Sequence, residues 1–264
     1  MYRMGNETGQ INVSVANMYR EASYKSEVVN QGLLGESIII EKKEKDFSLI
    51  RLADGYQGWI GNLQWVSEPE KTYKSMKIRS HFVRIYNLPD AGGDTIRDAT
   101  IGTNIQVIQK VKEWFEILLP DGSHGWLHKN SFSEFPDSSR QNIVRLAREF
   151  LGYPYHWGGR SSKGFDCSGL TQFVFSLFGF NLPRDSWMQH QAGKYCSDNP
   201  EEAQAGDLYF FADQGTKISH VGIALGEGRI IHVKGMVREN SLIPQNTDFN
   251  KELHNSFVDV RTFL

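Results

Sequence analysis

The first half of the chain contains an internal repeat with a spacing of 67 residues. Asp54-Gly55 recurs at this spacing as Asp121-Gly122. Gly58-Trp59 recurs in the same way as Gly125-Trp126. Several landmarks at one spacing indicate two copies of one structural unit. Each copy has short β-branched and aromatic runs before its Asp-Gly pair, which is a strong hairpin signal. The sequence therefore predicts two small all-β barrels.

The overall composition excludes several classes of protein. Of the 264 residues, 39% are hydrophobic and 23% are charged, as in ordinary soluble globular proteins. The formal net charge of −2 gives no reason to expect nucleic acid or an anionic membrane as a partner. No apolar run approaches the roughly 20 residues that cross a bilayer. The opening residues lack an apolar signal segment, so we expect a cytoplasmic protein, although a chain with a trimmed export signal would look the same.

A cysteine at the start of a predicted helix is the main chemical feature of the second half. Apolar residues recur with helical spacing from Leu170 to Phe178, and Asp166 is a candidate N-cap. Cys167 therefore lies in the first turn, where the helix dipole and free N–H groups favour thiolate and can hold an oxyanion. A small buried hydrophobic residue is the alternative interpretation, but the polar neighbours Asp166 and Ser168 weigh against it. The only other cysteine is Cys196, and we expect both thiols to be free.

Two histidines lie in the strands of a predicted hairpin, residues 219–225 and 229–233. With a three-residue loop between these strands, His232 lies opposite Gly222. His220 and His232 are then diagonal neighbours on one face of the sheet. A two-residue loop would put the two imidazoles on opposite faces. The clean alternation of apolar residues favours the first register.

A thiol at a helix start and two imidazoles on one sheet face are suited to nucleophilic catalysis. His220 would take the thiol proton, and His232 would hold the first imidazole in the correct tautomer and orientation. The same three side chains are possible zinc ligands. However, the sequence has neither Cys-x-x-Cys nor His-Glu-x-x-His, so we expect no metal and no other cofactor.

The motifs of the second half resemble those of NlpC-type cell-wall peptidases, in the same order along the chain. They are residues 165–170, 182–186, 205–208, 219–223 and 231–232. The resemblance implies a papain-like α+β fold that cleaves the bond between γ-D-glutamyl and an L-diamino acid in murein stem peptides. It also implies that Cys167 is the nucleophile, His220 the base and His232 the orienting residue, with Tyr155 as the active-site tyrosine.

The repeated pattern of the first half resembles the bacterial SH3-like domain, over residues 8–68 and 75–134. In NlpC-type peptidases with such domains, the first one narrows the cleft so that only a peptide with a free N-terminal L-alanine fits. The resemblance implies the following substrate-binding residues: Tyr56, Asp166, Ser168, Asp185, Ser186 and, in a looser match, Glu21. Other roles stay open, namely a surface aromatic for Tyr56, a helix cap for Asp166 and a capped loop for Asp185.

The sequence as a whole predicts a multidomain cysteine peptidase. We expect a first SH3-like domain over residues 1–70, a second over 71–136, and a papain-like catalytic domain over 137–264. The expected substrate is a murein stem peptide with a free N-terminal L-alanine, from which L-Ala-γ-D-Glu is released. We also expect a monomer. An amidase or acyltransferase on the same fold, and a non-catalytic protein that binds wall peptide, are the alternatives.

Overall fold

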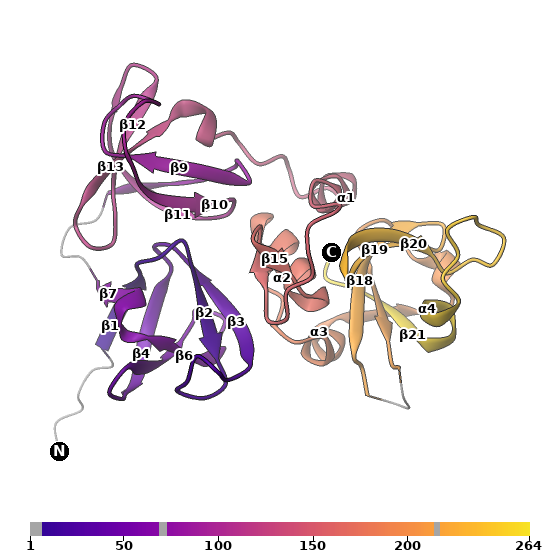
Figure 1. Ribbon diagram of the computed structural model, residues 1–264. Helices are drawn as coiled ribbons and strands as arrows, with labels where there is room; N and C mark the ends of the chain where they lie inside the picture. The colour runs from indigo at the N-terminus through magenta and orange to yellow at the C-terminus, as the bar shows by residue number, and fades with distance from the viewer. Residues whose placement is uncertain (1–6, 69–72, 214–216) are drawn as a thin grey trace. The chain divides into compact units, whose positions relative to one another are not determined.

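The computed structural model describes residues 7–68, 73–213 and 217–264 (Figure 1). The chain divides into two compact units, residues 1–134 and 135–264, and each is described by itself. The predicted boundary between residues 70 and 71 lies outside the described residues, so the domain count within the first unit stays a prediction. The described part of the chain contains no helix with the length and apolar character that crossing a membrane requires.

The first unit contains two antiparallel sheets. The first has the strand order β3-β2-β6-β5-β4-β1-β7 and the second has the order β10-β9-β13-β12-β11-β8. The first sheet and its short 3₁₀ helix comprise β1 (Glu7–Ile11), β2 (Val15–Tyr19), β3 (Val28–Leu33), β4 (Ser37–Lys43), β5 (Phe47–Arg51), β6 (Gln57–Gly61), η1 (Asn62–Gln64) and β7 (Trp65–Ser67). The second comprises β8 (Lys74–Lys77), β9 (Phe82–Tyr86), β10 (Thr95–Thr100), β11 (Asn104–Val111), β12 (Trp114–Leu118), β13 (His124–His128) and η2 (Lys129–Ser131).

The repeat seen in the sequence is a repeat of structure. Each of β1 to β6 begins 67 residues before its counterpart among β8 to β13. The strand pair Tyr19–Trp59 of the first sheet recurs as Tyr86–Trp126 in the second. Both Asp-Gly pairs form turns in which glycine has positive φ, 85° at Gly55 and 81° at Gly122. The prediction of two copies of one β unit is therefore confirmed.

The hydrophobic cores of the two sheets obey the same spacing. The first core is Ile11, Ala16, Met18, Ile38, Ile40, Ile50, Leu52 and Ile60. Adding 67 to each number gives Ile78, Val83, Ile85, Ile105, Val107, Ile117, Leu119 and Leu127, all of which pack in the second core. One residue of the first copy, Leu34, is also buried in the second core. This contact explains why the two sheets form one compact unit.

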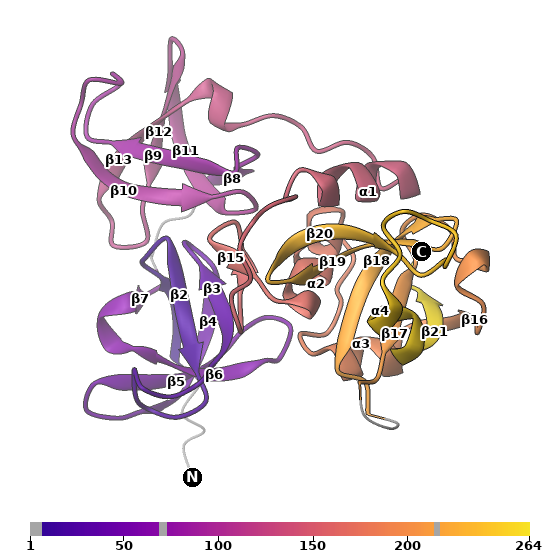
Figure 2. The ribbon, with the colours of Figure 1, turned by 45° about the vertical axis from the view of Figure 1, so that its right-hand side comes forward.

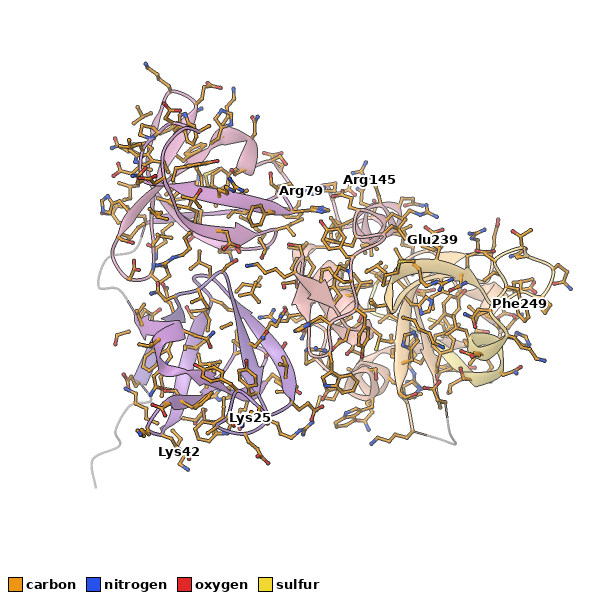
Figure 3. The ribbon with its side chains drawn as sticks, viewed as in Figure 1. Lys25, Lys42, Arg79, Arg145, Glu239 and Phe249 are labelled. Carbon is orange, nitrogen blue, oxygen red and sulfur yellow. The ribbon has the colours of Figure 1, made fainter. Side chains whose placement is uncertain are left out.

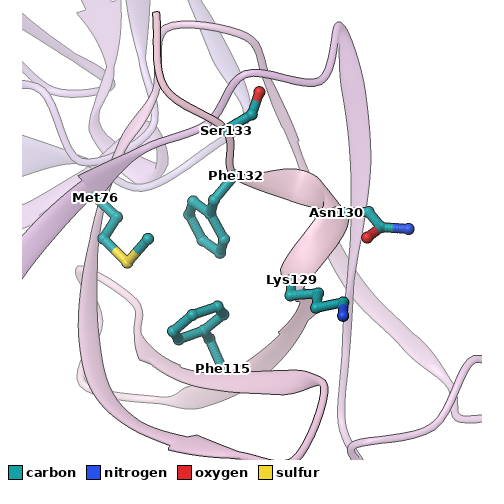
Figure 4. Close-up of a pocket in the computed structure, with 6 residues that line it drawn as sticks. All are labelled: Met76, Phe115, Lys129, Asn130, Phe132 and Ser133. Atoms are coloured by element: carbon teal, nitrogen blue, oxygen red, sulfur yellow. The ribbon is translucent and has the colours of Figure 1, made fainter.

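The second sheet has a cavity of about 520 Å³, in which Phe115 and Phe132 face one another (Figure 4). Its lining consists of Met76, Phe115, Lys129, Asn130, Phe132 and Ser133. None of the residues predicted to bind substrate lies in this lining. This cavity is therefore separate from the predicted site.

The second unit combines a six-stranded sheet, in the order β16-β21-β17-β18-β19-β20, with four α-helices. The strands are β16 (Lys194–Ser197), β17 (Leu208–Phe211), β18 (His220–Gly226), β19 (Arg229–Lys234), β20 (Met236–Ser241) and β21 (Phe257–Thr262). The helices are α1 (Arg140–Arg148), α2 (Cys167–Leu177), α3 (Ser186–Ala192), α4 (Lys251–Ser256) and the short η3 (Pro200–Glu202). A small hairpin, β14 (Arg160–Ser161) with β15 (Gly164–Phe165), precedes α2.

Helix α2 packs against β18 and β19, where Figures 1 and 2 both show it, and also contacts α1. Its interior side is aromatic: the ring of Phe173 lies 5.5 Å from that of Phe165, which lies 5.1 Å from that of Phe150. All three side chains are buried. Burial of large aromatic side chains is a major source of stability. It fixes α2 relative to β15 and the end of α1.

The register of the β18–β19 hairpin is as predicted at the histidines and differs at the turn. Gly222 pairs with His232, so His220 and His232 lie on one face. The predicted three-residue loop is wrong, because Gly226 pairs directly with Arg229 and only two residues separate them. A bulge at Leu225 shifts the register by one residue and offsets the shorter turn. The two imidazoles therefore stay on one face despite the two-residue turn.

Candidate active site

Cys167 is the first residue of α2, as the sequence predicts. Asp166 caps the helix, and its Oδ1 accepts a hydrogen bond of 2.7 Å from the N–H of Gly169. Cys167 as a whole residue is partly exposed, but its sulfur is buried, and backbone N–H groups of Val221 and Ser168 donate to it. Since Val221 directly follows His220, the thiol lies beside the first residues of β18.

The N–H groups at the helix start favour the thiolate, as expected, but burial reverses the net shift of the Cys167 pKa. Burial, which is the largest cause, and the negative charge of Asp166 together raise the pKa of Cys167 to about 12. The N–H groups of Val221 and Ser168 act in the opposite direction, but burial outweighs them. The resting sulfur is therefore a thiol at neutral pH, and attack on a carbonyl requires a base.

The two predicted histidines are joined directly. Nε2 of His220 lies 2.8 Å from Nδ1 of His232, and the two rings are nearly perpendicular. Burial lowers the pKa of His220 to about 3 and that of His232 to about 4, so both are neutral at neutral pH. Between the described side chains of Cys167 and His220 there is no direct hydrogen bond. Nδ1 of His220 thus has no partner among the described residues and is free to accept a proton.

Tyr155 borders the same site. Its backbone N–H donates to the carbonyl of Gly235, which fixes the residue beside the end of β19. Burial, with contributions from the nearby Cys167 and Asp166, raises the pKa of the phenol to about 12, so the hydroxyl remains a donor. A cavity of about 300 Å³ adjoins it, lined by Tyr155, Asp213, Ser219, His220, Val233, Lys234, Gly235, Glu252, Leu253 and Ser256.

The carboxylate of Asp166 accepts hydrogen bonds from several groups of the protein itself. Besides the N–H of Gly169, its carboxylate accepts the N–H of Gly158 at 2.9 Å and two donors of the Arg184 guanidinium. Arg184 is 2% exposed. The contacts thus support the helix-cap alternative for Asp166, and its binding of a substrate ammonium stays a prediction.

Three other predicted binding residues lie close to this ion pair in the chain. Ser168 is buried, and its hydroxyl accepts from Nη1 of Arg184 at 3.0 Å. Asp185 and Ser186 form the start of α3, where the Asp185 side chain makes no capping bond. Gln189 of α3 donates to the carbonyl of Ser168 and thereby ties α3 to α2. The structure brings these residues together, and their role toward a substrate stays a prediction.

The remaining predicted residues, Tyr56 and Glu21, belong to the first unit. Tyr56 packs against the first hydrophobic core and is partly buried. Glu21 follows β2 and is exposed, and its N–H donates to Ser26 Oγ at 3.0 Å. Their contribution to substrate binding stays a prediction.

Sequence reasoning missed two buried polar residues of the second unit. The sequence gives no functional role to Arg184, which pairs with Asp166, or to Asn240, which bonds His232. The polar motif at residues 182–186 was an available signal for Arg184. No comparable signal marks Asn240. The described residues contain no group of three His, Cys, Asp or Glu side chains that could hold a metal ion.

Replacing Arg184 with methionine should lower the free energy of unfolding of the second unit by about 3–5 kcal/mol, because it leaves the buried Asp166 carboxylate uncompensated. Arg148→Met is the matched control. Arg148 pairs with Glu239 at the surface, where Figure 3 labels Glu239, and its loss should cost no more than about 1 kcal/mol. Urea denaturation measures both. Equal losses in the two variants would contradict a structural ion pair at Arg184.

The buried histidines should make the second unit sensitive to acid. Because their pKa values are lowered in the folded state, the unfolded chain binds more protons below its own pKa of 6.5. As the pH is lowered below about 6.5, the free energy of unfolding should therefore decrease. The decrease should be about 1.4 kcal/mol per pH unit for each histidine, until the pKa of that histidine in the folded state is reached. In His232→Gln, the loss between about pH 7 and about pH 5 should be smaller by about 2 kcal/mol. An unchanged loss in urea denaturation would contradict a buried neutral His232.

Comparison with known proteins places this site in a family. Residues 152–256 match the NlpC/P60 family. The chain is 30% identical over 236 residues to the gamma-D-glutamyl-L-lysine dipeptidyl-peptidase of Bacillus cereus, which covers 82% of this chain and 70% of that relative. It is 26% identical over 261 residues to dipeptidyl-peptidase 6 of Lysinibacillus sphaericus, covering 90% of this chain and 93% of the relative.

A solved structure has the same fold. The crystal structure of an NlpC/P60 family protein from Bacillus cereus matches with a TM-score of 0.81 at 23% identity, covering 97% of this chain and 99% of that one. The family match spans α2 and the strands that carry His220 and His232. From the extent of the alignment with the first relative and the agreement in fold, the chain belongs to the NlpC/P60 family of cysteine peptidases.

Proposed function

We propose that this protein hydrolyses the bond between γ-D-glutamate and an L-diamino acid in murein stem peptides, with Cys167 as nucleophile. The observation that carries the proposal is the hydrogen-bonded pair of His220 on β18 and His232 on β19, with the thiol beside the start of β18. A gamma-D-glutamyl-L-lysine dipeptidyl-peptidase and a dipeptidyl-peptidase 6 among the relatives support the substrate class.

The first step forms a tetrahedral intermediate, which becomes a thioester when the amine leaves. The Cys167 thiol gives its proton to Nδ1 of His220 as the sulfur attacks the γ-carbonyl carbon of D-glutamate. Since the pKa of Cys167 is raised to about 12 and that of His220 is lowered to about 3, this transfer accompanies the attack and does not precede it. The N–H of Cys167 and the hydroxyl of Tyr155 donate to the oxyanion that forms.

The second step releases both products. The His220 imidazolium gives its proton to the amine of the diamino acid, and the C–N bond breaks. We place that amino acid in the cavity of about 300 Å³ beside His220, because the group that protonates the leaving amine forms part of its wall. His220 then deprotonates a water that attacks the thioester. This restores the thiol and releases the acyl product, L-Ala-γ-D-Glu.

We also propose that the substrate peptide must have a free N-terminal amine. An ammonium group in a desolvated site with carboxylates would be discriminated strongly from an acetylated amine. We propose Asp185, at the start of α3, as the carboxylate that pairs with the ammonium in the second unit. We propose Tyr56 and Glu21 as the contributions of the first unit.

Incubation with L-Ala-γ-D-Glu-L-Lys, or the same peptide with meso-diaminopimelate, should release L-Ala-γ-D-Glu, detected by mass spectrometry. Cys167→Ala should lower kcat by about 10⁴-fold or more, because it removes the nucleophile. Cys196→Ala, at the exposed cysteine of β16, is the matched control and should keep full activity. Turnover by Cys167→Ala, or no cleavage after D-Glu by the unmodified protein, would contradict the proposal.

A peptide acetylated at its N-terminus tests the requirement for a free amine separately. If only the free peptide is cut after D-Glu, the amine is required, and Tyr56→Ala should relax that requirement or weaken hydrolysis of the short free peptide. If both peptides are cut equally, the protein is an endopeptidase without a free-amine requirement, and the proposed roles of Tyr56, Glu21 and Asp185 are wrong.

A further inference from the structure

Asn240 continues the line of polar side chains that begins at His220. It lies on β20, two residues after Arg238, which pairs with His232 of β19. Because alternate residues of a strand share a face, Asn240 lies on the same face as His232. Its Oδ1 is 3.1 Å from Nε2 of His232, and Asn240 is 5% exposed. Three neighbouring strands thus supply one hydrogen-bonded chain, His220–His232–Asn240, of which the last two residues are buried.

The amide of Asn240 is held in one orientation. Its Nδ2 donates to the backbone carbonyl of Asp248 at 3.1 Å, and a carbonyl can only accept. The segment that carries Asp248 folds back along β20, with Ser241 bridged to Phe249, which is labelled in Figure 3. The N–H of Ser241 donates to the same carbonyl at 3.0 Å. With Nδ2 fixed there, the atom that faces His232 is the oxygen.

This orientation determines both histidine tautomers. An amide oxygen only accepts, so Nε2 of His232 must carry a proton and donate it to Asn240. Neutral His232 then has a bare Nδ1, which accepts from Nε2–H of His220. Neutral His220 in turn has a bare Nδ1. That is the nitrogen left to take the thiol proton of Cys167.

We propose that Asn240 is a positioning residue that fixes the tautomers of His232 and His220, and so keeps Nδ1 of His220 ready as the base. This inference rests on the proposed role of Cys167 and His220. Without the acceptor at residue 240, His232 can carry its proton on Nδ1 and donate it to His220. His220 would then be protonated on Nδ1 and unable to accept from the thiol. A wrong tautomer costs up to ~10⁴-fold in rate.

Asn240 has a competing structural role, in which its donor Nδ2 anchors the segment after β20. Two variants separate the roles. Asn240→Leu removes both the acceptor and the donor. Asn240→Asp keeps an acceptor toward His232 and loses the donor toward Asp248. It is assayed at about pH 8.5, so that the added carboxylate does not leave His232 protonated.

The experiment measures alkylation of Cys167 by iodoacetamide, which requires the base but no peptide substrate. A Cys196→Ala background leaves one reactive thiol, and circular dichroism reports folding. Asn240→Leu should slow alkylation about tenfold or more, while Asn240→Asp should stay within about fivefold of the parent. Asn246→Leu is the matched control, because it removes a contact of the same segment, Nδ2 to Ser241 Oγ, and should keep the parent rate.

Peptide hydrolysis gives the second readout, in which Asn240→Leu should lower kcat by a similar factor and leave KM within about twofold. A folded Asn240→Leu variant that keeps more than about a tenth of the alkylation rate would overturn the proposal. If that variant does not fold, Asn240→Asp decides: a retained rate supports the tautomer role, and a loss beyond about fivefold overturns it. Because alkylation needs no peptide, a wrong assignment of the substrate leaves this test intact.

Discussion

The hydrogen bond of 2.8 Å between the imidazoles of His220 and His232 is the contact on which the rest of the site depends. It forms because Gly222 pairs with His232, which puts the two rings diagonally across β18 and β19. A Cβ at Gly222 would lie 2.9 Å from that of His232, so only glycine allows this approach. The bulge at Leu225 sets the register, and the packing of α2 on β18, with the N–H of Val221 donating to the sulfur, holds Cys167 beside His220.

Burial determines how this site can work. It keeps both imidazoles neutral and the thiol protonated, so the resting site contains no thiolate–imidazolium pair. Neutral imidazoles have a direction, because only one nitrogen of each carries a proton. The amide of Asn240 imposes that direction from the far end of the chain of hydrogen bonds. The buried ion pair Asp166–Arg184 positions the thiol, because Asp166 caps the start of α2, where Cys167 lies.

The sequence was informative where one local pattern determines the structure. The 67-residue repeat predicted both β units, and apolar alternation predicted the face shared by His220 and His232. The two-residue turn was missed, because a bulge at Leu225 restores the same register. The effect of the helix start on the thiol was predicted, but the net rise of the thiol pKa was not, because burial depends on packing from distant segments. Asn240 was invisible for the same reason: its partners are His232 and the carbonyl of Asp248, which only the folded sheet brings together.

The most direct test of this account is nitrogen NMR of the histidine rings in the resting protein at neutral pH. His220→Gln and His232→Gln variants assign the two sets of signals. The account predicts that both rings are neutral, with the proton on Nε2 and a bare Nδ1. A proton on Nδ1 of His220, or an imidazolium at either residue, would contradict the proposed chain from Asn240 to the thiol.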